Sequence, residues 1–140
     1  MSAERLFCYG SLQIAEVIEA LLGRIPESAP ALLPGYEIYR LRDASYPAVA
    51  PLEGALAPGA LYSDITEKEL ARLDVFEGEP YARKMATVRL EDGSSIGAWL
   101  YRPPAAKRHW LTEERWDLES FKRAGLKKFM EQCFGESALV

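Results

Sequence analysis

The 140-residue sequence predicts an α+β fold, and more specifically a small mixed, partly closed β-barrel with flanking helices. Short apolar and β-branched segments, each bounded by turn residues, would supply about six or seven strands. The segments with helical spacing of apolar residues are well separated along the chain, which is typical of an α+β domain. The length suits one domain and no long linker is visible, so we expect residues 1–140 to form a single domain.

The chain opens with a predicted strand, a tight turn and a helix. An apolar run over residues 5–9 predicts the strand, which stops at the turn Tyr9-Gly10-Ser11-Leu12. Apolar residues then recur on one helical face, and these are Ile14, Val17, Ile18, Leu21 and Leu22. They predict an amphipathic helix, and Gly23 is suited to end it.

The turn before this helix has two possible roles. Backbone N–H groups at the start of a helix are unpaired and can bind a carboxylate or an oxyanion, and the Ser11 hydroxyl would add a donor. Alternatively, Gly10 only permits the tight turn and Ser11 only caps the helix. Taken alone, the four residues favour this second interpretation, because short Gly-Ser turns are common.

The proline-rich middle of the chain predicts short strands. Prolines exclude a continuous helix over residues 24–35. The strand-like segments that follow are residues 36–41, 46–50 and 59–62. Pro47 and Pro51 indicate that the second of these segments lies at a sheet edge or at a bulge.

The last part of the chain predicts a hairpin and a final helix. Residues 81–90 and 96–101 read as strands joined by a turn over residues 91–93, and the second strand is apolar on both faces. Asp117 is a suitable N-cap for the last helix, and Gly135 would end it. The apolar face of this helix comprises Leu118, Phe121, Leu126, Phe129 and Met130.

Residue counts exclude several chemistries. His109 is the only histidine and there is no Cys-x-x-Cys, which rules out a multi-histidine metal site. Any Ser–His–Asp or Cys–His arrangement would have to use His109. No glycine-rich phosphate-binding motif occurs. We therefore expect no metal and no cofactor, and any catalysis must use carboxylates, hydroxyls and backbone groups.

Composition also limits the partners. The net charge of −4 argues against nucleic-acid binding, because binding phosphates needs clustered positive charge. The basic residues late in the chain alternate with acidic ones, as on a solvated helix face. No apolar run approaches the roughly 20 residues that a membrane-spanning helix needs, and no signal peptide is visible. Cys8 and Cys133 are expected to be reduced thiols of a cytoplasmic protein, with a disulfide between them as the less favoured alternative. We expect a monomer or a weak dimer, because Trp110, Trp116 and Phe121 suit either a core or an interface.

Glu77 is the candidate catalytic residue. Thr66 and Glu69 form a capping box that opens a helix, and the helical pattern stops at an acidic turn over residues 74–80. A carboxylate on such a turn can point into a cavity, and a partly apolar setting would raise its pKa towards neutrality. Val75, Phe76 and Tyr81 could supply that setting, and Glu77 would act as a general acid/base.

The same stretch also has simpler interpretations. Acidic turns after helices are usually solvated, as we expect for Glu79. Arg83 is more often a salt-bridge partner than a substrate clamp, and Tyr81 is more often a core residue than a catalytic one.

Three motifs occur together in one order: Tyr9-Gly10-Ser11-Leu12, then Tyr46-Pro47-Ala48, then Leu-Asp-x-Phe-Glu-Gly-x-x-Tyr-x-Arg from Leu73 to Arg83. On these motifs the chain resembles the gamma-glutamylcyclotransferase-like superfamily. It is most similar to the branch of the plant avirulence-induced proteins and the gamma-glutamylamine cyclotransferases. The resemblance runs from Phe7 to about Phe134, and the sequence departs from that branch at Arg102-Pro103-Pro104.

The resemblance implies a gamma-glutamylcyclotransferase-like fold, which is a small mixed β-barrel with flanking helices. It implies that Glu77 is the catalytic acid/base, that Tyr9, Gly10, Ser11 and Leu12 hold the γ-glutamyl group of a small-molecule substrate through backbone atoms, and that Tyr81 lines the pocket. Such enzymes release 5-oxoproline and an amine by intramolecular attack of the substrate α-amine, without a metal. The alternative is a catalytically inactive small-molecule-binding or interaction module on the same fold.

Overall fold

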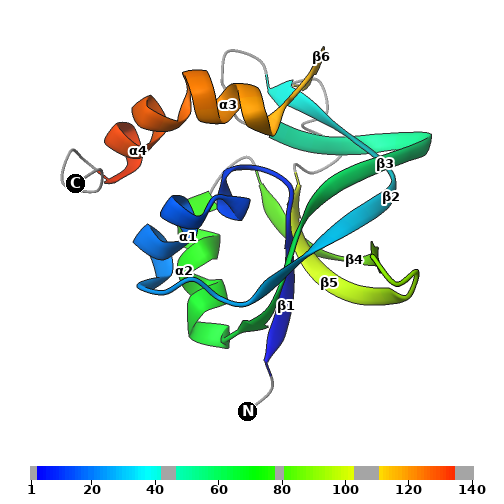
Figure 1. Ribbon diagram of the computed structural model, residues 1–140, viewed down its shortest axis with the longest axis horizontal. Coiled ribbons are helices and arrows are strands. Elements are labelled where there is room, and N and C mark those ends of the chain that lie inside the picture. Colours follow the sequence, from blue (N-terminus) through cyan, green and yellow to red (C-terminus); the bar gives the residue numbers. More distant parts are fainter. Residues whose placement is uncertain (1–2, 42–46, 78–80, 103–110, 135–140) are drawn as a thin grey trace.

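The computed structural model describes residues 3–41, 47–77, 81–102 and 111–134 (Figure 1). The strands are β1 Glu4–Cys8, β2 Ser28–Leu41, β3 Pro47–Ile65, β4 Ala82–Leu90, β5 Ser95–Arg102 and β6 Leu111–Arg115. The helices are η1 Ser11–Gln13 (a 3-10 helix), α1 Ala15–Leu22, α2 Glu67–Glu77, α3 Leu118–Ala124 and α4 Leu126–Phe134.

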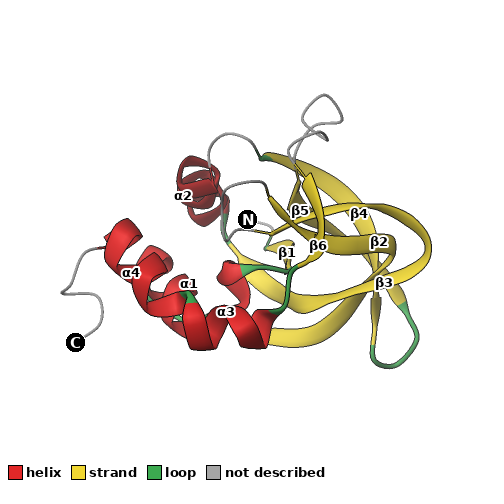
Figure 2. Cartoon of the chain, turned by 90° about the horizontal axis from the view of Figure 1, so that it is seen from above, coloured by secondary structure: helices red, strands yellow, loops and turns green. Residues whose placement is uncertain are grey.

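Five strands close into a barrel, in the order β3-β1-β5-β4-β2, with a further β2–β3 pairing that completes the ring. The β1–β5 pair is parallel and the other four pairs are antiparallel, so the barrel is mixed. β6 pairs antiparallel with the C-terminal end of β2, through Tyr39 and Leu41. The helices lie at one side of the molecule and the barrel strands at the other (Figure 2). This architecture confirms the predicted mixed barrel with flanking helices.

The end of α1 and the start of α2 are as predicted. Gly23 adopts a left-handed conformation (φ 77°), and its N–H donates to the Glu19 carbonyl to end α1. At the start of α2, the Thr66 N–H donates to Glu69 Oε1 (3.0 Å) and the Glu69 N–H donates to Thr66 Oγ1 (3.1 Å), which is the predicted capping box. Arg24 also donates to both oxygens of Glu69, at 2.8 and 2.7 Å, and thereby ties α2 to the chain after α1.

The proline-rich region forms longer strands than predicted. β2 begins at Ser28, and β3 is one continuous strand where the sequence predicted two. Proline excludes a helix here, as expected, but a strand accepts proline at irregular positions, and the β2–β3 register shifts between Pro34 and Tyr36.

The C-terminal region contains one strand that was not predicted, and its single predicted helix is divided in two. β6 was missed, because its charged sequence has no apolar alternation, and it forms through pairing with distant β2. The last helix begins as predicted, with the Ser120 N–H donating to Asp117 Oδ2 (2.9 Å), but it breaks at Gly125 into α3 and α4. The Phe121 ring packs against Gly125, within 3.1 Å of where a Cβ atom would lie. Gly135, the predicted end, lies outside the described residues.

The buried side chains form two clusters. One fills the barrel and includes Phe7, Tyr9 and Leu100. The other lies between the barrel and the helices and includes Leu6, Cys8 and Phe121, so Phe121 is a core residue. Within the described ranges, no helix has the length and apolar character needed to cross a bilayer.

Candidate active site

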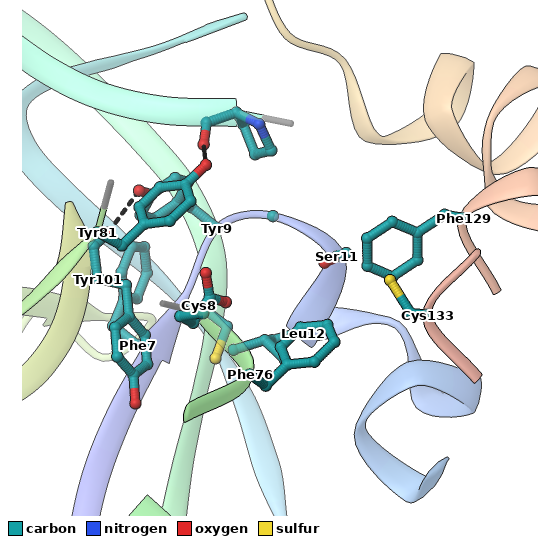
Figure 3. A pocket seen from close by; sticks show the side chains of 13 residues that line it. Phe7, Cys8, Tyr9, Ser11, Leu12, Phe76, Tyr81, Tyr101, Phe129 and Cys133 are labelled. Carbon is teal, nitrogen blue, oxygen red and sulfur yellow. Dashed lines mark hydrogen bonds between the residues drawn. The ribbon is translucent and has the colours of Figure 1, made fainter. Parts of the chain in front are cut away.

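A cavity of about 270 Å³ lies where the barrel meets the helices (Figure 3). Its walls come from the end of β1, η1, the start of β3, the end of α2, β5 and α4. The lining residues are Phe7, Cys8, Tyr9, Gly10, Ser11, Leu12, Pro47, Phe76, Glu77, Tyr81, Tyr101, Phe129 and Cys133. Every site residue predicted from the sequence lines this cavity, and all three sequence motifs contribute to it.

Gly10 brings the first two motifs into contact. A Cβ atom at position 10 would lie 2.6 Å from Cγ of Pro47, which is closer than real Cβ atoms come to a neighbour, so a larger residue would push the turn away from β3. The Tyr81 hydroxyl donates to the Pro47 carbonyl from the other side. Pro47 is therefore a shared contact between the first and third motifs, whereas its neighbour Tyr46 lies outside the described residues.

The turn after β1 differs from the predicted strand–turn–helix. Ser11 starts the short 3-10 helix η1, and α1 begins only at Ala15. The residue before α1 is Ile14, and no side chain caps either helix, so the capping role suggested for Ser11 was wrong. Ser11 is among the residues that line the cavity.

Hydrogen bonds hold the turn in shape. The Gln13 and Ile14 N–H groups donate to the carbonyls of Gly10 and Ser11, at 3.2 and 3.0 Å. The buried Tyr62 hydroxyl donates to the Leu12 carbonyl at 2.7 Å. The N–H groups of Ser11 and Leu12 precede Gln13, the first donor of the 3-10 helix, and therefore have no partner within it.

Glu77 is the last residue of α2, not part of a turn after the helix. The sequence prediction placed the helix end at Leu73, but α2 continues for one more turn. Gly78, Glu79 and Pro80 lie outside the described residues. The change matters because the helix fixes the direction of the Glu77 side chain, which a flexible acidic turn would not.

Burial raises the pKa of Glu77 from 4.5 to about 7. Its position at the C-terminal end of α2, where the helix dipole opposes negative charge, acts in the same direction. Among the ion pairs of the described residues, none includes Glu77. Burial also raises the pKa values of Cys8 and Tyr9, and the nearby Glu77 charge raises them further. Glu77 can therefore exist in both protonation states near neutral pH.

The apolar surroundings of Glu77 differ in part from those predicted. Phe76 and Tyr81 line the cavity, as expected, but Val75 is 83% exposed and points to solvent. Two helical positions correspond to more than half a turn, so residue 75 faces away from the side of α2 that carries residue 77. Tyr101 and Phe7, from the strands, supply apolar surface where the sequence prediction placed Val75.

Asp74 anchors the end of α2 to the barrel. Arg83 donates to both of its carboxylate oxygens, at 2.9 and 3.2 Å, and the Tyr101 hydroxyl donates to Oδ1 at 2.6 Å. The Arg83 guanidinium also lies over the Trp99 ring, 4.4 Å from its centre. Arg83 is therefore a salt-bridge partner, and it holds α2 one turn before Glu77.

The sequence reasoning missed several lining residues. Tyr101 could have been found from its place in the second hairpin strand, but nothing local indicated Phe129 or Cys133, which the fold of the last helix brings to the site. Cys8 and Cys133 both line the cavity and are both free thiols. Within the described residues, no group of three or more His, Cys, Asp or Glu side chains is placed to hold a metal ion.

Arg102 takes no part in the cavity lining. Its guanidinium donates to the Tyr36 hydroxyl at 2.9 Å and links the end of β5 to β2. Pro103 and Pro104, the rest of the departure from the plant branch, lie outside the described residues.

The fold is that of solved gamma-glutamyl cyclotransferase structures. One structure described as a gamma-glutamyl cyclotransferase aligns with a TM-score of 0.64 over 74% of this chain and 68% of its own, at 17% identity. The solution structure of an Arabidopsis thaliana protein aligns with a TM-score of 0.72 at 34% identity, covering 94% of this chain and 89% of its own.

Sequence comparison shows the family. Residues 6–118 match the model of the family described as "Gamma-glutamyl cyclotransferase, AIG2-like", and the chain belongs to it. AIG2-like protein B of Arabidopsis thaliana is 34% identical over 126 residues, which are 90% of this chain and 73% of that protein.

Proposed function

We propose that this protein is a gamma-glutamyl or gamma-glutamylamine cyclotransferase in which Glu77 is the general acid/base. The observation that carries the proposal is a glutamate with a pKa of about 7 that faces an apolar cavity next to a fixed backbone turn. A proton-transfer group is most effective when its pKa lies near the working pH. Membership of the cyclotransferase family supports the same reaction class.

The reaction needs only one proton-transfer group. The Glu77 carboxylate accepts a proton from the substrate α-amine as the amine nitrogen attacks the γ-carbonyl carbon. A carbon–nitrogen bond forms, and the carbonyl oxygen takes up the displaced electron pair as an oxyanion. When this intermediate collapses, the bond to the leaving nitrogen breaks and protonated Glu77 returns the proton to that nitrogen. The products are 5-oxoproline and a free amine.

The turn over Tyr9, Gly10, Ser11 and Leu12 would hold the substrate α-carboxylate or the developing oxyanion through its backbone N–H groups. Tyr81 would pack beside the γ-glutamyl chain, because its hydroxyl is held by Pro47 and its ring forms part of the wall. Holding the two reacting groups of one molecule in contact can supply about 7–11 kcal/mol of barrier lowering. This contribution explains how the reaction can proceed without a covalent enzyme intermediate.

The direct test is release of 5-oxoproline from a panel of γ-glutamyl amines and γ-glutamyl dipeptides. We expect turnover by the wild type and a fall in kcat of about 10²–10⁴-fold for Glu77→Gln. Glu67→Gln is the matched control, since Glu67 is an exposed residue of the same helix. Unchanged turnover by Glu77→Gln would refute the role of Glu77, and saturable binding without turnover by the wild type would identify an inactive binding module.

A further inference from the structure

Two residues from neighbouring strands bind the same carboxylate of α2. Tyr101 of β5 and Arg83 of β4 are directly opposite partners in the β4–β5 ladder. The Tyr101 hydroxyl donates to Asp74 Oδ1 at 2.6 Å, and Arg83 donates to both carboxylate oxygens, at 2.9 and 3.2 Å. The guanidinium is itself held against the Trp99 ring. We call Tyr101 and Arg83 the Asp74 clamp.

The clamp holds α2 close to Glu77. Asp74 and Glu77 are three positions apart, so they lie on one side of the helix and about 4.5 Å apart along its axis. Among the hydrogen bonds of the described residues, none holds the Glu77 carboxylate itself. The position of this carboxylate therefore follows the position of the helix end.

Apolar packing also holds this part of α2, but it fixes a different property. Leu73 is buried, and the Phe76 ring meets the Phe129 ring edge to face with centres 6.2 Å apart. Apolar burial depends mainly on area and is not directional, whereas a hydrogen bond needs a narrow range of distances and angles. The Asp74 clamp therefore fixes the rotation of the helix end, and with it the direction of Glu77.

Tyr101 also contacts the turn that is proposed to hold the substrate. Its backbone carbonyl accepts a hydrogen bond from the Tyr9 hydroxyl, and Tyr9 is the first residue of that turn (Figure 3). The side chain of Tyr101 thus binds the helix that carries Glu77, while its main chain binds the turn. One buried residue joins the two parts of the site.

The ion pair of the clamp adds little to stability. The Asp74 and Arg83 side chains are 39% and 26% exposed, and ion pairs with such access to water stabilise a fold only weakly. A bidentate pair is nevertheless a precise geometric constraint, and here a buried tyrosine adds a third hydrogen bond. A function in positioning accounts for this arrangement better than a function in stability.

From these contacts we infer that Tyr101, Arg83 and Asp74 are positioning residues, which hold Glu77 at the distance and direction from the substrate turn that catalysis requires. The inference rests on the proposed cyclotransferase function. Glu77 must reach first the α-amine and then the leaving nitrogen, so a small displacement of the helix end impairs both proton transfers. The three residues act through Glu77 and not on the reacting atoms.

The first test removes single contacts of the clamp. Tyr101→Phe keeps the ring in the cavity wall and the backbone bond to Tyr9, but it loses the hydroxyl. We expect kcat for 5-oxoproline release to fall about 10–100-fold and KM to change less than about 3-fold, because the substrate turn is untouched. Asp74→Ala should reproduce this fall, although Asp74 does not line the cavity. A fall in Tyr101→Phe alone would mean that Tyr101 acts directly on the substrate, and would overturn the inference.

A second ion pair on the same helix provides the control for stability. At the start of α2, Arg24 donates to both oxygens of Glu69, and neither residue lines the cavity. Arg24→Lys and Arg83→Lys each keep the charge and lose the bidentate geometry. We expect both to lower the midpoint of urea unfolding slightly, but only Arg83→Lys to lower kcat, by about 10-fold. Equal kcat values for the two variants would refute the inference.

A measurement without substrate separates this inference from the proposed function. Carboxyl-carbon NMR follows the titration of Glu77, whose pKa burial raises to about 7. Asp74 and Arg83 neutralise each other. The groups that sense the Glu77 charge have raised pKa values and are uncharged at neutral pH, and these are Cys8, Tyr9, Tyr101 and Cys133.

We expect Tyr101→Phe, which changes no charge, to move the titration of Glu77 towards its ordinary pKa of 4.5, because a released helix end admits water. Arg24→Lys should leave the titration where it is in the wild type. If the wild type releases no 5-oxoproline, the cyclotransferase function is wrong and the NMR titration decides alone. A shift in Tyr101→Phe then supports positioning of Glu77 by the clamp, and an unchanged titration overturns it.

Discussion

Glu77 carries a proton in the folded state at pH values where an exposed glutamate has already lost it. Its pKa is raised by burial to about 7 from 4.5, so the folded protein binds this proton more tightly than the unfolded chain does. Ionisation of Glu77 therefore destabilises the fold progressively between these two pH values, and the effect is complete above the higher one. Below the lower value, the residue makes no such contribution.

Replacement of Glu77 by glutamine should consequently stabilise the protein only at higher pH. We expect the free energy of unfolding of Glu77→Gln, relative to wild type, to increase by on the order of 1–2 kcal/mol between pH 4 and pH 8, less than the full pKa shift implies because the residue is partly exposed. Urea unfolding at both pH values measures this change. An equal difference at both pH values for Glu77→Gln would contradict the raised pKa.

At the residue scale, the sequence identified the right glutamate for reasons that were partly wrong. The motif from Leu73 to Arg83 pointed to Glu77, but the expected acidic turn and the contribution of Val75 were both incorrect. Sequence patterns locate helix ends only approximately, and the last turn of α2, from Asp74 to Glu77, mixes charged and apolar residues. The Asp74–Arg83 pair was within reach of sequence reasoning, because both residues belong to the same motif.

At the element scale, the contact between Gly10 and Pro47 sets the distance from the β1–η1 turn to β3. A Cβ atom at position 10 would require one of these elements to move, since Pro47 is buried and rigid. Displacement of the turn would also displace the backbone groups proposed to hold the substrate.

Gly10→Ala should therefore affect catalysis as well as folding. We expect a loss of about 1–3 kcal/mol of stability from overpacking, and a fall in kcat/KM of about 10²-fold from misplacement of the turn. Thermal unfolding and the 5-oxoproline assay measure the two effects. Gly97→Ala is a suitable control, because a Cβ atom there would meet only Met85 at an ordinary 3.5 Å. Full activity of Gly10→Ala would show that the turn does not position the substrate.

Elements with strong local signals were predicted, and those made by tertiary contacts were not. The capping box at Thr66, the stop at Gly23 and the cap at Asp117 are encoded within a few residues, and all three are present in the structure. The break at Gly125 depends on packing against Phe121 as well as on the low helix propensity of glycine. β6 exists only because β2 offers it a partner.

At the scale of the whole molecule, closure of the barrel depends on close approach of β1 and β3. A Cβ atom at Gly59 would lie 2.4 Å from the Cys8 carbonyl oxygen and 2.7 Å from the Phe7 ring. The backbone atom cannot move aside without breaking the β1–β3 ladder, in which Cys8 pairs with Ala60.

Gly59→Ala should for this reason destabilise the entire barrel. We expect a loss of about 3 kcal/mol in the free energy of unfolding, measured by urea denaturation with a single cooperative transition. Gly97→Ala, also on a barrel strand, should change stability by less than about 1 kcal/mol. If Gly59→Ala were as stable as wild type, β1 and β3 would not approach as closely as described.

The barrel class was predictable because short strands and separated helices leave few architectures for one small domain. The strand order was not predictable, since the parallel β1–β5 pair joins residues such as Leu6 and Trp99 that are far apart in the chain and share no local pattern. The same reason explains why Phe129 and Cys133 were absent from the predicted site. They reach the site only because α4 packs beside it in the folded chain.

The cavity draws on both ends of the chain, from Phe7 in the first strand to Cys133 in the last helix. During synthesis on a ribosome, the barrel strands and Glu77 emerge well before α4 does. A nascent chain that has not yet released residue 133 lacks one side of its cavity, including the surface of Phe129. The site therefore becomes complete only after residue 133 has left the ribosome, well after the barrel strands and Glu77.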